Sequence, residues 1–170
     1  MATTESTLES TNFLQPTGFK VIVLKKRFKN LEFFANNVLH PELSVGPATV
    51  PFRGTNAHLP GDKLEYGTLT IEAIMDENMN VYKEMHSWLE STVTGKYKTA
   101  DKIRVDDQDL STYDISLSVL SSKNNTTNVI RYKSAFPINI GSVNFQSTVG
   151  DVQYVTFPVT FQYTGFTITD

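Results

Sequence analysis

The residue types best suited to catalysis or metal binding are few in this sequence, and they are widely spaced. Its three histidines, His40, His58 and His86, are separated by eighteen and twenty-eight residues. A zinc-binding helix of the metalloprotease type needs two histidines four residues apart, and no pair has that spacing. The histidine pattern therefore does not predict a local metal site.

A group of acidic residues, Asp106, Asp107 and Asp109, is the next candidate for binding a cation. Calcium loops of the EF-hand type need a glycine for the sharp turn and a closing glutamate that binds through both oxygens. This segment has neither residue at the required position. A solvated acidic loop is the simpler interpretation.

Nucleophile and phosphate-binding motifs are missing as well. The chain has no cysteine, which excludes thiolate zinc sites, cysteine nucleophiles and disulfides. No G-x-S-x-G sequence is present, and no glycine-rich loop follows a predicted strand. We therefore expect no enzymatic activity, no cofactor and no bound metal.

The overall composition is typical of a protein that folds around its own core. Its 170 residues are 39% hydrophobic and carry a net charge of -3, which does not favour a tight grip on nucleic acid. Residues 1–12 are rich in Ser, Thr and Glu and predict a flexible N-terminal arm rather than a signal peptide. We expect residues 13–170 to form one domain and find no apolar run that would span a membrane.

Alternation of apolar and polar residues is the main structural signal. Thr68–Met75, Asp114–Leu120 and Val155–Tyr163 each place apolar side chains at every second position, as a half-buried strand requires. Further strands are predicted at Phe19–Leu24, Leu31–Val38, Ala48–Phe52, Val129–Phe136 and Ile138–Phe145. Turn-forming residues separate the strands at Lys29-Asn30, Pro60-Gly61-Asp62, Lys123-Asn124-Asn125 and Gly150-Asp151.

One strand contains a proline. Pro158 lies within Val155–Tyr163, where it cannot donate a backbone hydrogen bond to a neighbouring strand. Because prolines in sheets are confined to edges and bulges, we expect an edge or a bulge at this position.

A single amphipathic helix is predicted over Asp76–Glu90, where apolar residues recur at helical spacing and Asp76 can cap the N-terminus. The chain's one tryptophan lies on this apolar stripe, and we interpret it as an anchor between helix and sheet. The core anchors expected from the helix are Val81, Met85, Trp88 and Leu89. The fold class is then mainly β, an antiparallel sandwich or half-barrel with one packed helix.

Four segments of the sequence carry a resemblance to a known family. TGFKVIVL and LEFFANNVLHPEL come first, followed by VPFRGTNAHLPGDKLEYGTLTIEAIMDENMNVYKEMHSWLE, which combines a V-P-F start, a P-G-D turn, a strand and an acidic step into a helix. AFPINIGSVNFQSTVGDVQYVTFPVTFQY adds an aromatic-Pro-x-x-Ile-Gly element and a final alternating strand. In this order, over about residues 12 to 165, the segments resemble the tail tube proteins of contractile-tailed (myovirus-type) bacteriophages. Pro158 and the long polar segment before Thr11 depart from the family pattern.

The resemblance implies a structural virion protein. Its expected assembly is a hexameric ring in which each copy lends strands to a closed barrel, and rings stack into a hollow inner tail tube. DNA would pass through the lumen without specific binding, with tail sheath and baseplate proteins as partners. The expected location is the phage tail, assembled in the host cytoplasm, with no membrane contact.

Two sets of residues are expected to serve such an assembly. A polar, weakly acidic lumen would let DNA pass, and the candidates for it are Thr68, Thr70, Glu72, Thr156, Thr160 and Gln162. A projecting hairpin over Arg53–Lys63 is expected to join stacked rings, with Arg53, Gly54, Asn56, Gly61, Asp62 and Lys63 as the candidates.

Alternatives from the same and from other classes stay open at this point. One is a baseplate or tube-terminating protein of the same fold, and another is the inner tube of a type VI or extracellular contractile injection system, which carries protein. A carbohydrate-binding or hydrolytic β-sandwich would need exposed aromatics or paired carboxylates on one face, and the sequence contains no such grouping.

Overall fold

A computed structural model of the chain describes residues 13–23, 28–94, 112–146 and 154–169. The expected flexible arm at residues 1–12, the acidic group at 106–109 and the predicted turn at Gly150-Asp151 lie outside these residues.

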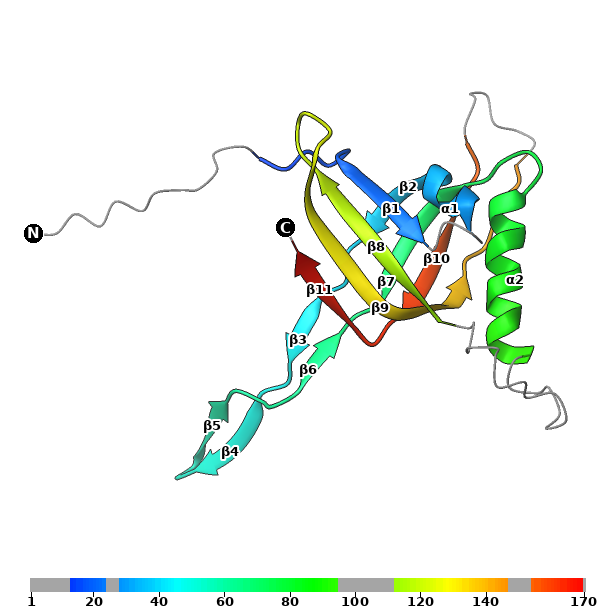
Figure 1. Cartoon of the computed structure of the whole chain (residues 1–170). Coiled ribbons are helices and arrows are strands. Elements are labelled where there is room, and N and C mark those ends of the chain that lie inside the picture. The colour runs from blue at the N-terminus through cyan, green and yellow to red at the C-terminus, as the bar shows by residue number, and fades with distance from the viewer. Residues whose placement is uncertain (1–12, 24–27, 95–111, 147–153, 170) are drawn as a thin grey trace, which may run out of the picture.

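The body of the protein is a seven-stranded antiparallel sheet (Figure 1). Six strands follow the order β1 (Phe19–Val23), β8 (Tyr113–Leu120), β9 (Thr126–Ile140), β10 (Thr156–Gln162), β7 (Leu69–Ile74) and β2 (Ala35–Leu39), and β11 (Gly165–Thr169) pairs with β9. We call β1, β8, β11 and the first half of β9 sheet I. The second half of β9, β10, β7 and β2 form sheet II.

The long strand β9 bends at Ser134 and thereby connects the two sheets. Ser134 has a φ of 52°, and its backbone N–H donates to Oδ1 of Asp114 on β8 at 3.0 Å. The pairing of β8 with β9 shifts register here, which is the signature of a bulge. Pairing with β8 ends at Ala135, and from Phe136 onward β9 pairs with β10 instead.

The core lies between the two sheets and beneath the long helix. Alternation places Phe157, Val159 and Phe161 of β10 on the inner side, all fully buried, as the sequence predicts. The inner positions of β7 match them across the pairing: Leu69, Ile71 and Ala73. Each large side chain buried in this way contributes about 1.5–3 kcal/mol.

The long helix α2 (Asn80–Thr94) packs against β9 and the short helix α1 (Lys29–Phe34). Asp76 caps it, since Oδ1 accepts from the N–H of Val81 at 3.3 Å and Oδ2 accepts from the side chain of Asn80 at 2.7 Å. Trp88 stacks on Phe28 at 4.5 Å between ring centroids. Of the four expected core anchors, Val81, Met85 and Trp88 are buried and Leu89 is half-buried.

Two strand predictions are wrong in detail. The predicted strand Leu31–Val38 is divided into α1 and β2, so the expected turn at Lys29-Asn30 is the start of a helix. Phe28 and Leu31 are both buried, at a spacing of three residues that suits a helical turn. The sequence predicts Val129–Phe136 and Ile138–Phe145 as separate strands. The first lies within the single strand β9, which also includes residues 138–140, whereas residues 141–145 lie outside any strand.

Pro158 lies in an interior strand, so the expected edge position is wrong. Its carbonyl accepts from the N–H of Gly141 at 2.7 Å, just beyond the end of β9. Because a residue's N–H and C=O point to the same side of an antiparallel strand, the missing N–H faces the place where that ladder ends. Gly141 leaves room for the ring, since a Cβ there would lie 2.5 Å from Cγ of Pro158. A bulge does occur nearby, between Thr160 and Phe161.

A long two-stranded arm projects from sheet II, away from α2 (Figure 1). Its proximal part pairs β3 (Leu43–Val45) with β6 (Leu64–Tyr66), and its distal part pairs β4 (Ala48–Phe52) with β5 (Thr55–Leu59). The chain reverses at Arg53 and Gly54, which have positive φ values of 42° and 84°. The predicted turn Pro60-Gly61-Asp62 is therefore a connection within the arm rather than its tip.

Candidate assembly interface

The outer face of sheet II is mostly polar along its two central strands, β7 and β10. Thr70 of β7 lies directly opposite Thr160 of β10, and Thr156 donates a hydrogen bond from Oγ1 to Oε1 of Glu72 at 2.8 Å. Gln162 ends β10 on the same outward alternation, and Thr68 immediately precedes β7. The structure thus brings the six residues expected to line a lumen onto one face, opposite the core.

Both outer edges of sheet II are free in the described part of the chain. β2 pairs only with β7, and residues 136–140 of β9 pair only with β10. Each edge exposes an aliphatic side chain, because Leu39 on β2 is 65% exposed and Ile138 on β9 is 46% exposed. Unpaired edges carrying apolar residues are templates for pairing with another chain.

The arm is an amphipathic ribbon that lacks a core of its own. In its proximal part, Val45 lies opposite Leu64 on one face, whereas Ser44 lies opposite Glu65 on the other. In its distal part, Val50 pairs with Ala57, and Thr49 pairs with His58 on the opposite face. Aliphatic residues on the apolar side remain about half exposed: Leu43, Val45, Val50, Leu59 and Leu64.

Such a ribbon is marginally stable alone, because two strands bury too little surface. The described part of the chain leaves its apolar face about half exposed. The sequence analysis missed this face, although the alternation at Leu43–Val45 and Leu64–Tyr66 was a usable signal.

The residues expected to join stacked rings all lie on the arm. Arg53 and Gly54 form its tip, and Asn56 lies on β5. Gly61, Asp62 and Lys63 connect β5 to β6 midway along the arm, where Gly61 packs against the carbonyl oxygen of Gly46. The tip and the middle of the arm are thus separate surfaces, which the sequence analysis treated as one loop.

An aromatic cluster holds the root of the arm to the body. His40, which follows β2, shares a 2.7 Å hydrogen bond between Nδ1 and the hydroxyl of Tyr132. Tyr66, at the end of β6, packs edge-on against Tyr163 and Phe166, with centroids 6.0 and 5.7 Å away. Partial burial lowers the pKa of His40, and burial raises the pKa of both Tyr132 and Tyr163. These shifts favour a neutral imidazole that accepts the hydrogen bond.

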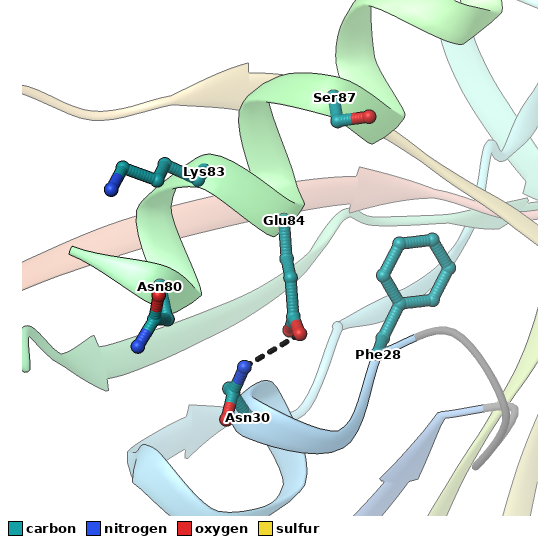
Figure 2. A pocket seen from close by; sticks show the side chains of 6 residues that line it. All are labelled: Phe28, Asn30, Asn80, Lys83, Glu84 and Ser87. Atoms are coloured by element: carbon teal, nitrogen blue, oxygen red, sulfur yellow. Dashed lines mark hydrogen bonds between the residues drawn. The ribbon is translucent and has the colours of Figure 1, made fainter. Parts of the chain in front are cut away.

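A shallow pocket lies between α1 and α2 (Figure 2). Asn30 donates from Nδ2 to Oε1 of Glu84 at 2.6 Å, while Oε2 of Glu84 is buried without a hydrogen-bond partner. Burial raises the pKa of this carboxyl group. The amino group of Lys83 binds the carbonyl of Asn78 instead of facing the carboxylate, as its direction in Figure 2 indicates.

The pocket is lined by Phe28, Asn30, Asn80, Lys83, Glu84 and Ser87. Its one carboxyl group, that of Glu84, is held by the side-chain amide of Asn30. In the part of the chain that the structure describes, no three His, Asp or Glu side chains gather as metal ligands would. The described helices include none with the length and apolar character of a membrane span.

The sequence of this bent antiparallel sheet with its projecting ribbon also matches a known protein family. The family model described as phage tail tube protein matches residues 7–169. The chain belongs to the phage tail tube protein family. Among curated proteins, none matches this family member in sequence.

Solved structures of low sequence identity share the fold of this tail tube family member. One is the tube-terminating cap of the anti-feeding prophage, with a TM-score of 0.67, 15% identity and coverage of 99% of each chain. Another comes from the extended sheath–tube complex of an extracellular contractile injection system, PVC, with a TM-score of 0.66, 15% identity and 99% coverage of each chain. A type six secretion system protein is similar at a TM-score of 0.52, with 12% identity and coverage of 88% of this chain and 81% of that chain.

Proposed function

We propose that this protein forms hexameric rings that stack into the hollow inner tube of a contractile phage tail, through which DNA passes. The proposal rests on the arrangement of sheet II, in which the polar outer face of β7 and β10 lies between two free edge strands. Copies would join edge to edge, β2 of one against the second half of β9 of the next. The outer faces of β7 and β10 in successive copies would then line one continuous wall.

Strand direction supports this joint. β2, β7, β10 and β9 alternate in direction, so β2 and β9 of one copy run antiparallel. A ring axis preserves the direction of every strand, and the new pair between neighbours would therefore be antiparallel as well. Closure of this kind removes the open edges that a single copy leaves.

Size also supports a ring rather than a single copy as the conduit. Six copies with four strands each would give a wall of about 24 strands, spaced by about 4.8 Å. The closed wall would have a diameter of roughly 37 Å, measured from backbone to backbone, if its strands ran parallel to the ring axis. A single copy cannot enclose a double helix, because sheet II contains only four strands.

The outward face carries little charge. Glu72 is the one ionisable residue among the outward positions of β7 and β10, and the others are Thr, Ile, Pro and Gln. A wall of hydroxyls and sparse carboxylates would repel phosphates weakly and would not hold DNA by counterion release. A tail sheath and a baseplate are the partners that a tube of this kind requires.

A tube-terminating or baseplate role is the second candidate, because the fold also occurs in a tube-terminating cap of 15% sequence identity. The inner tube of a protein-carrying injection system is a third, since an extracellular contractile injection system contains the fold too. The length of the assembly separates a terminator, which caps, from a tube protein, which polymerises. The cargo separates phage tubes from injection systems.

The test is negative-stain electron microscopy of the purified protein over a concentration series. Hollow rings or filaments of constant diameter are expected. Ile138→Lys should prevent ring closure at one edge of sheet II and leave a folded monomer. Val93→Lys on α2, where the parent side chain is 54% exposed, introduces the same charge away from both edges and should assemble normally. A protein that stays monomeric at every concentration, with no rings induced by partner proteins, would refute the proposal.

A further inference from the structure

Two exposed aromatic residues mark a surface that the body leaves uncovered. Phe145 is 70% exposed and Tyr154 is 77% exposed. Phe145 lies after the end of β9 at Ile140, and Tyr154 lies before the start of β10 at Thr156. Val143, between β9 and Phe145, packs against the core.

The backbone beneath this surface is held by hydrogen bonds. The N–H of Met75 donates to the carbonyl of Val155 at 2.8 Å, next to Tyr154. The N–H of Gly141 donates to Pro158 at 2.7 Å, where the chain leaves β9. These bonds fix the chain next to Tyr154 and at the start of the segment that leads to Phe145.

Register places this aromatic surface at the end of sheet II opposite to the arm. The chain leaves sheet II for the arm after Leu39, which pairs with Thr70, and returns at Leu69. The other end of β7 is Ile74, which pairs with Thr156, two residues after Tyr154. Figure 1 shows the same separation, with the arm and the segments that flank residues 147–153 at opposite ends of the body.

Both ends of sheet II therefore expose apolar side chains. The arm carries an aliphatic face about half exposed, with Val50 at 43% and Leu59 at 52% in its distal part. The opposite end carries two aromatic rings that are exposed by more than two thirds. Rings stacked in one direction along an axis bring unlike ends together, which is a heterologous contact. Burial of both apolar surfaces in that contact removes them from water.

We propose that the apolar face of the arm in one ring docks on the end of a copy in the next ring that exposes Phe145 and Tyr154. This inference rests on the proposed function and identifies the receptor for the stacking arm. The occupant is a second copy of this chain, because a stacked copy presents its arm to that end. The contact explains why each end keeps apolar side chains that the body does not cover.

The absence of cysteine from the chain permits a specific cross-linking test. A double variant, Val50→Cys with Tyr154→Cys, is assembled and treated with a short bifunctional maleimide. Head-to-tail contact should then give a ladder of covalent multiples on a denaturing gel. Each single-cysteine variant can give at most a dimer. Assembled filaments of the double variant that yield no ladder would overturn the inference.

Substitution supplies a second, independent readout. Phe145→Ser with Tyr154→Ser should leave rings intact and reduce filaments to single rings or very short stacks. Val93→Ser, at a side chain exposed to a similar extent as the arm residues, is the control and should give parental filaments. The melting temperature of each variant shows that the fold is retained.

The outcomes separate the two proposals. Single rings from the Phe145 and Tyr154 double variant, together with a ladder from the cysteine pair, support the docking surface. Filaments of parental length from the double serine variant refute the docking surface and leave the tube function intact. A parent protein that forms neither rings nor filaments refutes both.

Discussion

Gly61 lies against the carbonyl oxygen of Gly46, so closely that a Cβ atom at position 61 would overlap that oxygen. At position 46, in contrast, an added Cβ would meet only open space. The two strands of the arm therefore approach at a point where one glycine is required and the facing one is not. Because this point lies between the β3–β6 and β4–β5 ladders, it sets the direction of the distal half of the arm.

Gly61→Ala should therefore shorten or abolish filaments while rings still form. The added methyl group should push the two strands of the arm apart and change the direction of the tip of the arm. It does not contact the core of the body. We expect the free energy of unfolding of the body to change by about 0.5 kcal/mol or less. Filament length by negative-stain microscopy and the thermal midpoint measure the two effects. Gly46→Ala is the matched control and should retain parental filaments; parental filaments from Gly61→Ala would show that arm direction does not matter.

Reversal of charge on the polar face of sheet II tests whether that face lines the lumen. Glu72→Lys should convert an assembled tube from one that ignores duplex DNA into one that binds it, with affinity that falls as salt rises. Glu77→Lys makes the same change in net charge at an exposed residue before α2. Binding of labelled duplex to filaments, followed by fluorescence anisotropy, compares the two. Equal binding by both variants would place Glu72 outside the lumen.

Trp88 should be the costliest side chain of α2 to remove. Its ring contacts Phe28, Tyr113 and Phe161, at centroid distances of 4.5, 5.2 and 5.4 Å. Trp88→Ala leaves a cavity between helix and sheet and should destabilise the fold by about 3–5 kcal/mol. Val93→Ala on the same helix should cost about 0.5 kcal/mol or less, because Val93 is largely exposed. Denaturant unfolding gives both values, and a small loss for Trp88→Ala would contradict its place in the core.

His40 should make the root of the arm sensitive to acid. Partial burial lowers its pKa below 6.5 in the folded state, so the fold disfavours the protonated ring. The contribution of neutral His40 to the free energy of unfolding is therefore present above pH 6.5 and is lost as the pH falls below that value. Between about pH 7.5 and about pH 5.5, the parent should lose more thermal stability than His40→Gln, which can still accept from Tyr132. His58→Gln, on the exposed arm, is the control and should keep the parental loss; identical pH profiles for parent and His40→Gln would exclude the effect.

Alternation and helical spacing were sufficient to locate the strands and the helix that form most of the core. β7, β8 and β10 and the helix α2 agree with the predicted segments within a few residues. Their inner and outer faces also follow from the sequence, because side-chain direction in a strand depends only on residue parity. Parity thus separates outward residues such as Thr70 and Thr160 from the core residues beside them, whereas the register of β7 with β10 places these two opposite each other.

The predictions that were wrong concern short segments, where local preference and tertiary contacts favour different structures. Leu31–Phe34 is an apolar and aromatic run that suits a strand, yet it forms α1 because Leu31 packs into the core and Asn30 binds Glu84. Pro158 suits an edge by local rules, yet it lies inside sheet II because β9 ends beside it and Gly141 makes room. Tertiary contacts overrode local propensity in both cases.

The sequence by itself determined a mainly-β chain with one long helix, and it carried the resemblance to tail tube proteins. Only the tertiary structure decided which strands are neighbours, which edges of sheet II stay free, and that the arm and the pair Phe145 and Tyr154 lie at opposite ends. The physical reason is the range of the interactions. Periodicity is written into consecutive residues, whereas sheet order and register arise from pairing between segments far apart in the chain.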